Sequence, residues 1–158
     1  MSNISAAQVK ELREKTGLGL MDCKKALEDA EGNLDKAIEE LRKTSGVKAS
    51  KKSGRSAADG LIAIKNIEDQ IFMIEVNCET DFVARDDSFV EFTSQTLKSY
   101  SENPDKTLQE LMDDGIEDNR EKIVQKLGEN IVVRRVAKTE SSTTVSYTHL
   151  RAHETNSN

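Results

Sequence analysis

The chain has 158 residues and a formal net charge of −6, with 33% charged and 35% hydrophobic side chains. This length predicts at most two small hydrophobic cores, and four Phe, two Tyr and no Trp predict that these cores are mainly aliphatic. The acidic balance argues against nucleic acid as a partner, because proteins that wrap nucleic acid use basic side chains to release counterions from phosphates.

Membrane and disulfide-rich classes are also excluded. No apolar segment approaches the roughly 20 residues that span a bilayer, and the first five residues do not resemble a secretion signal. Cys23 and Cys78 lie far apart without a CxxC spacing, which is typical of reduced, buried thiols rather than of a disulfide scaffold or a zinc site. We therefore expect a cytoplasmic protein that makes no membrane contact.

Residues 1–46 predict a module of three short helices. Ser5, followed three residues later by Gln8, has the pattern of a capping box, and Gly17 suits the end of the first helix. Apolar side chains recur at the spacing i, i+3, i+4, i+7 in two further segments, one closed by Gly32 and one ending before Ser45. Each helix has one apolar face, so the three are expected to pack as a bundle.

Residues 47–58 predict a basic linker. They contain four basic residues, no acidic residue and almost no large apolar side chain. Such a segment is typically solvated, and no aromatic residue is interleaved for base stacking. A linker is therefore favoured, with phosphate or RNA binding through residues 48–55 as the alternative.

Residues 59–137 predict a second unit, which begins with strands. Alternating apolar residues over 61–64 and 71–78 predict a β-hairpin, and residues 131–136 predict a third strand. The side chains on one face of the second strand are expected to be buried. They are Phe72, Ile74, Val76 and Cys78.

Helices are expected to cover this sheet. Ser88 and Thr107 each precede a Glu by three residues, which predicts two helix starts, and a further helix should end before Gly128. The fold class is therefore α+β, with about three antiparallel strands packed by helices. Residues 138–158 lose any sustained apolar period and are expected to form a weakly ordered tail.

No residue pattern indicates catalysis, a cofactor or a metal. Both histidines lie in the patternless tail, and Gly17-Leu18-Gly19 lacks the third glycine and the preceding strand of a nucleotide loop. The acidic residues between 101 and 121 lack the spacing of a calcium loop. We expect no enzyme, and no direct nucleotide binding.

The segment at residues 79–86, between an apolar strand and a capped helix, has two interpretations. The pattern favours Thr80 or Asp81 as a helix N-cap, with Phe82 and Val83 in the core. Alternatively, an aromatic ring beside a carboxylate at a strand tip projects as an interface anchor.

Three stretches resemble one family, elongation factor Ts, the exchange factor that recharges elongation factor Tu. Residues 76–85, VNCETDFVAR, resemble its signature. Residues 16–27, TGLGLMDCKKAL, are similar to a second family stretch, within a module that resembles a ubiquitin-associated domain. Residues 126–136, KLGENIVVRRV, complete a resemblance that covers about residues 3–137.

The resemblance implies a mechanism in which an Asp-Phe pair enters the G domain of elongation factor Tu. The ring of Phe82 would wedge between helices near the bound magnesium, with Asp81 as its polar neighbour and Thr80 and Val83 beside them. The magnesium and then GDP would be released.

The resemblance also implies that the helical module docks on the same G domain through Lys24, Leu20 and Met21, and that Leu127 supplies another apolar contact. The residues themselves leave alternatives open. Leu20 and Met21 could belong to the bundle core, Leu127 to the core of its helix, and Lys24 could be solvated.

The sequence departs from the family pattern after residue 149. Residues 146–149, SYTH, match a family segment that continues into a second α/β subdomain, whereas this chain ends at Asn158. The resemblance implies that the part that follows in the family supports a homo-oligomer. We interpret the chain as truncated, with a tail foreign to the family and His149 as an isolated contact. The alternative function is an adaptor that binds a ubiquitin-like protein or a peptide through the helical module.

Overall fold

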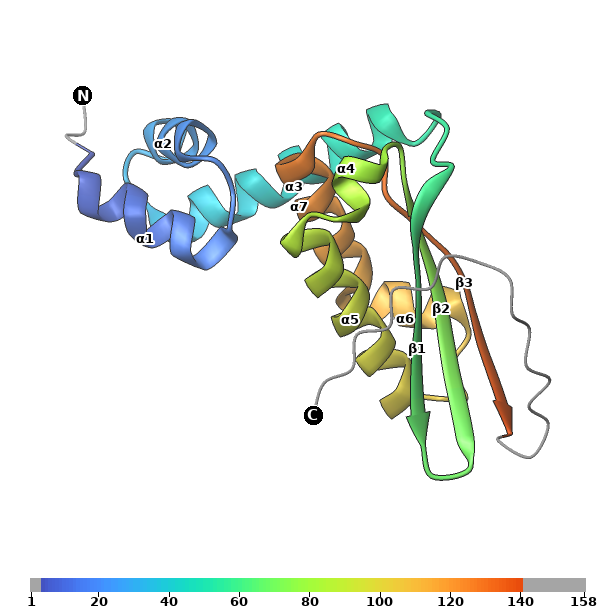
Figure 1. Cartoon of the computed structure of the whole chain (residues 1–158). Coiled ribbons are helices and arrows are strands. Elements are labelled where there is room, and N and C mark those ends of the chain that lie inside the picture. Colours follow the sequence, from blue (N-terminus) through green and yellow to red (C-terminus); the bar gives the residue numbers. More distant parts are fainter. Residues whose placement is uncertain (1–3, 141–158) are drawn as a thin grey trace.

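The computed structural model describes residues 4–140 as a helical module joined to a sheet that is covered by helices on one face (Figure 1). In chain order the elements are α1 (Ala6–Thr16), α2 (Leu20–Asp29), α3 (Leu34–Lys52), β1 (Asp59–Ile67), β2 (Gln70–Cys78), α4 (Asp81–Ala84), α5 (Asp87–Glu102), α6 (Leu108–Leu111), the π-helical turn η1 (Met112–Ile116), α7 (Glu117–Leu127) and β3 (Val132–Glu140). This arrangement confirms the predicted α+β class.

The helical module has its own hydrophobic core, as the apolar spacing predicted. Ser5 and Gln8 form the expected capping box, and Gly17 ends α1 in the left-handed conformation with φ 68°. Leu12, Cys23 and Leu27 are fully buried at the centre of the bundle.

The third helix is longer than predicted. α3 does not end before Ser45 but continues to Lys52, so the first half of the expected linker is helical. Packing explains the difference, because Ser45 and Ala49 are both 1% exposed. At Gly46 an added Cβ would lie 3.1 Å from the Glu121 carboxylate of α7. Burial against α7 therefore outweighs the weak helix propensity of the Ser–Gly pair.

The three strands form one antiparallel sheet in the order β1-β2-β3, which confirms the predicted hairpin and third strand. A register shift between Glu75 and Val76 interrupts the pairing of β2 with β3. β3 extends to Glu140, into the segment predicted to be weakly ordered, because its backbone pairs with Gln70 of β2 although the side chains of residues 137–140 are exposed.

The second core lies between the sheet and the helices. The predicted inward side chains of β2 are all buried, and Phe72 meets Tyr100 of α5 edge to face with ring centroids 5.7 Å apart. α5 begins at Asp87 and is capped by Asp86 rather than by Ser88 as expected, because the Asp86 carboxylate accepts a hydrogen bond from the Ser88 N–H at 2.8 Å.

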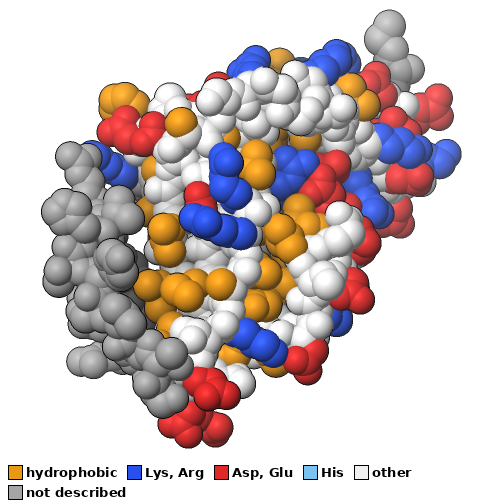
Figure 2. All heavy atoms as spheres, turned by 90° about the vertical axis from the view of Figure 1, so that its right-hand side faces the viewer, with side chains coloured by type: hydrophobic (Ala, Val, Ile, Leu, Met, Phe, Trp, Pro, Cys, Tyr) orange, Lys and Arg blue, Asp and Glu red, His pale blue; other side chains and the backbone are white. Residues whose placement is uncertain are grey.

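The other face of the sheet carries exposed apolar side chains. Ile62 and Ile64 of β1 are 53% and 57% exposed. Figure 2, which looks onto the side of the molecule where the sheet lies, shows hydrophobic side chains beside Lys and Arg. Among the described residues, no helix has both the length and the apolar character needed to cross a membrane.

Candidate functional site

The segment between β2 and α5 forms a tight, capped turn. Thr80 is extended, with φ −131° and ψ 156°, and its Oγ1 accepts a hydrogen bond from the Val83 N–H at 3.4 Å. The Ala84 N–H donates to the Thr80 carbonyl at 3.1 Å and closes the single turn of α4. Thr80, one of the two predicted candidates, is thus the N-cap, and Asp81 and Phe82 occupy the first two helical positions.

Phe82 lies on the outside of this turn. Its side chain is 84% exposed, whereas Val83 is half-buried against the second core and Ala84 is 7% exposed. The interpretation of Phe82 as a core residue is therefore wrong, because Val83 and Ala84 occupy the inward side of the turn. A ring this exposed is left without core packing, which is the arrangement expected of an interface anchor.

Asp81 is exposed beside the ring and forms an ion pair with Arg85. The Arg85 guanidinium lies 3.3 Å from the Asp81 carboxylate, and both side chains are more than half exposed. Exposed pairs of this kind contribute only about 0–1 kcal/mol. The carboxylate can therefore exchange Arg85 for a donor on another molecule at little cost.

Two carboxylates hold the base of the turn against the loop between α7 and β3. Glu129 accepts hydrogen bonds from the N–H groups of Glu79 and Thr80 at 3.0 Å each, and from the Thr80 hydroxyl at 2.6 Å. In return, the Glu79 carboxylate accepts from the Asn130 N–H at 2.6 Å. We call these four residues, Glu79, Thr80, Glu129 and Asn130, the carboxylate clasp.

Sequence reasoning missed the clasp. Thr80 and Glu129 are 49 residues apart, so no local spacing connects them. One signal was available in the sequence. Glu79 directly follows a predicted strand and Glu129 lies just before another, and carboxylates that become partly buried at such positions require hydrogen-bond partners.

Cys78, directly before the clasp, is unsuited to nucleophilic chemistry. Burial, together with the negative charge of Glu129, raises the pKa of its thiol to about 12. Its Sγ lies 3.2 Å from the Thr80 carbonyl, to which the thiol donates. The thiol stays protonated at neutral pH and acts as a structural donor.

The second group of predicted residues lies on α2. Leu20 and Met21, at the start of this helix, are 54% and 73% exposed, so their interpretation as bundle core is wrong. The inward positions belong instead to Cys23, Ala26 and Leu27. Lys24 is exposed and lies 3.8 Å from Glu28, one turn further along the helix.

Leu127 and His149, the remaining predicted residues, belong to neither the α4 turn nor α2. Leu127 ends α7 and is half-buried against the second core, ahead of Gly128 with φ 80°. His149 lies outside the described residues. Leu20, Met21 and Lys24 on α2 and the residues at the turn of α4 therefore form two surfaces on different elements.

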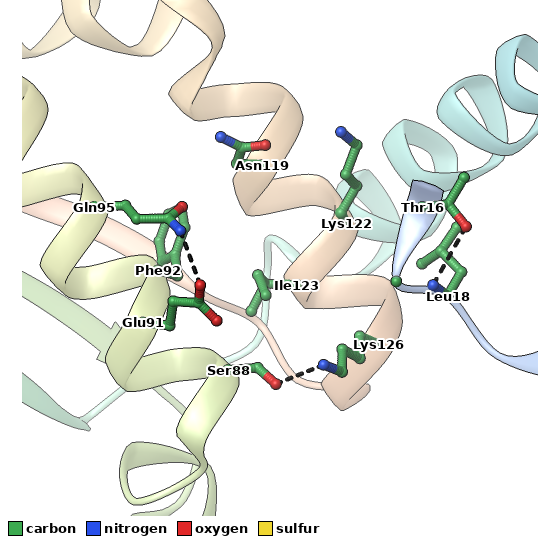
Figure 3. Close-up of a pocket in the computed structure, with 11 residues that line it drawn as sticks. Thr16, Leu18, Ser88, Glu91, Phe92, Gln95, Asn119, Lys122, Ile123 and Lys126 are labelled. Atoms are coloured by element: carbon green, nitrogen blue, oxygen red, sulfur yellow. Dashed lines mark hydrogen bonds between the residues drawn. The ribbon is translucent and has the colours of Figure 1, made fainter. Parts of the chain in front are cut away.

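A small cleft of about 180 Å³ lies between the helical module and the second core (Figure 3). Thr16, Gly17 and Leu18 line one side, and α5 and α7 line the other. Lys126 donates to the Ser88 hydroxyl at 2.6 Å across the α5–α7 side. None of the predicted site residues within 4–140 lines it. Within residues 4–140, no group of three or more His, Cys, Asp or Glu side chains is arranged to hold a metal ion.

The fold and these surfaces define an α+β protein that exposes apolar side chains at a sheet tip and on a helical module. The sequence model of the family described as Elongation factor TS matches residues 79–155, past residue 137 where the motif resemblance ends. The chain belongs to the elongation factor Ts family.

Similar curated proteins carry the same family name. The chain is 53% identical to Elongation factor Ts of Marinobacter nauticus over 151 residues, which cover 94% of this chain and 52% of the relative. It is 50% identical to Elongation factor Ts of Hahella chejuensis, over 94% of this chain and 53% of the relative. It is 49% identical to Elongation factor Ts of Shewanella oneidensis, over 92% of this chain and 51% of the relative. The chain spans about half the length of these relatives.

Proposed function

We propose that the chain takes part in translation elongation as a guanine nucleotide exchange factor, which binds the G domain of elongation factor Tu and promotes the release of GDP. The observation that carries this proposal is the 84% exposure of Phe82 in a capped turn inside the matched family region. The names of the relatives support the role in elongation.

The proposed mechanism rests on differential binding. A partner that binds the nucleotide-free state more tightly than the GDP state shifts the equilibrium only by the difference between those affinities. Full burial of a Phe side chain contributes about 1.5–3 kcal/mol, or roughly a 10- to 100-fold change in an equilibrium constant. The Phe82 ring therefore contributes to exchange if it is buried in the partner only when the magnesium and nucleotide site is disturbed.

No bond is made or broken by the chain in this mechanism. Phe82 supplies apolar area, and Asp81 supplies a carboxylate that can leave Arg85 for a donor in the partner. The chain is thus proposed to regulate a GTPase without being an enzyme and without a cofactor of its own.

The experiment that tests the proposal measures release of fluorescent GDP from purified bacterial elongation factor Tu. Addition of the 158-residue chain is expected to accelerate release in a concentration-dependent, saturable manner. No acceleration at any concentration up to saturation of the partner would overturn the exchange function for this chain.

The helical module is proposed to supply a separate docking surface through Leu20, Met21 and Lys24. Both apolar side chains are exposed, so the double substitution Leu20→Ser and Met21→Ser should leave folding intact and weaken binding to elongation factor Tu by at least about tenfold. Isothermal titration calorimetry measures the dissociation constant of each variant with elongation factor Tu. Ile64→Ser, at similar exposure on the sheet, is the matched control and should bind normally.

A second test addresses both surfaces together. If a variant that combines Lys24→Ala with Phe82→Ala bound as tightly as the unmodified chain, the assigned surface would be wrong. Leu127 is proposed as an additional apolar contact through its exposed part, and His149 as a contact of the segment beyond residue 140.

The RNA alternative is weakened by the ion pairs of the basic segment. Lys48 lies 3.2 Å from Asp22, and Arg55 lies 3.5 Å from Glu79. Two of the four basic side chains therefore already have acidic partners, which reduces the positive charge available to phosphates.

A further inference from the structure

We infer that Glu129 is a positioning residue for the proposed exchange surface. Glu129 holds the turn that carries Phe82 in one orientation before any partner is bound. The inference rests on the proposed function, and it concerns a residue whose hydrogen bonds go to the base of the turn. It follows from the carboxylate clasp, in which a single side chain satisfies three donors at the base of the turn.

The geometry places Glu129 where it controls the direction of α4. Its Oε2 accepts from two successive N–H groups, those of Glu79 and Thr80, at 3.0 Å each. Its Oε1 accepts from the Thr80 hydroxyl at 2.6 Å, the same hydroxyl oxygen that accepts from the Val83 N–H. Glu129 therefore orients the N-cap, and the N-cap orients the single helical turn that carries Phe82.

The clasp has a second, reciprocal arm. The Glu79 carboxylate accepts from the Asn130 N–H, and the Asn130 side-chain amide donates to the carbonyls of Arg55 at 2.8 Å and Ser53 at 3.4 Å. Asn130 is 2% exposed, so these bonds are shielded from water. The turn is thereby tied to the segment that directly follows α3, the helix shared with the docking module.

This arrangement matters for exchange because a helix of four residues is too short to be stable in isolation. One turn has few hydrogen bonds of its own, and ordering it only on binding would reduce affinity for the state in which the ring is buried. Three hydrogen bonds to a negatively charged acceptor are of the strong, charge-assisted kind. The free chain therefore presents Phe82 already oriented.

The first test uses the free chain and does not depend on elongation factor Tu. Amide hydrogen exchange measured by NMR should be at least about tenfold faster at Glu79 and Thr80 in Glu129→Ala than in the unmodified chain, with the amide of Ile74 in β2 unchanged. Glu102→Ala, on the exposed end of α5, is the matched control. Unchanged exchange at both Glu79 and Thr80 would overturn the inference.

The second test separates positioning from docking. In the GDP-release assay, Glu129→Ala should lower the maximal rate by about tenfold with little change in the half-saturating concentration, because the Leu20 and Met21 surface remains intact. Full maximal acceleration by Glu129→Ala would contradict the inference. If the unmodified chain itself gave no acceleration, the proposed function would fail, and hydrogen exchange alone would still decide whether the clasp holds the turn.

Variants at Thr80 keep the test decisive if Glu129→Ala does not fold. Thr80→Ser retains the hydroxyl that donates to Glu129, so amide exchange at Glu79 in the free chain should be slower in Thr80→Ser than in Thr80→Val, which removes the hydroxyl at nearly constant shape. Equal amide exchange rates at Glu79 in Thr80→Ser and Thr80→Val would show that the clasp does not hold the turn.

Discussion

Replacing Phe82 with alanine is expected to remove most of the acceleration of GDP release, by about 10- to 100-fold, while changing the free energy of unfolding by no more than about 0.5 kcal/mol. The two effects separate because the side chain is 84% exposed and makes almost no core contact in the free chain. Fluorescent GDP release from elongation factor Tu measures the first effect, and urea denaturation measures the second.

The matched control is the same substitution seven positions later. Phe89 is 0% exposed at the start of α5, so Phe89→Ala is expected to cost about 3–5 kcal/mol of folding free energy. Phe82→Ala should resemble the unmodified chain in stability and Phe89→Ala should not. A Phe82→Ala variant that accelerated GDP release as fully as the unmodified chain would exclude the ring as the wedge.

Local chemistry made several elements predictable from the sequence. The capping boxes at Ser5–Gln8 and Thr107–Glu110 depend on residues three positions apart, and both form as expected. The alternation along β2 also predicted its buried face, because successive side chains of a strand point to opposite sides. Each of these features is determined within a few residues.

Features that depend on distant segments were not predictable in the same way. Pattern alone favoured Phe82 as a core residue, but its direction is decided by Val83 and Ala84, which fill the inward side of the turn. The extension of α3 depends on burial against α7, far along the chain. The same holds for Glu129, whose importance rests on bonds to a loop about 50 residues earlier.

Gly60→Ala is expected to lower the free energy of unfolding by about 2–6 kcal/mol. Gly60 has φ +147°, and an added Cβ would lie 2.1 Å from the Val76 carbonyl oxygen and 2.7 Å from the Asn77 Cα. Strained backbone of this kind costs about 1–3 kcal/mol, and a clash against backbone atoms that cannot move aside costs about 1–3 kcal/mol more.

Chemical denaturation of Gly60→Ala and Gly54→Ala side by side tests this expectation. An added Cβ at Gly54 meets no atom within 4 Å, so Gly54→Ala should change stability by less than about 0.5 kcal/mol. Equal stability of the two variants would show that β1 can shift away from β2 at little cost. Because Val76 and Asn77 lead directly into the carboxylate clasp, a Gly60→Ala chain that still folds should also show faster amide exchange at Glu79 and Thr80.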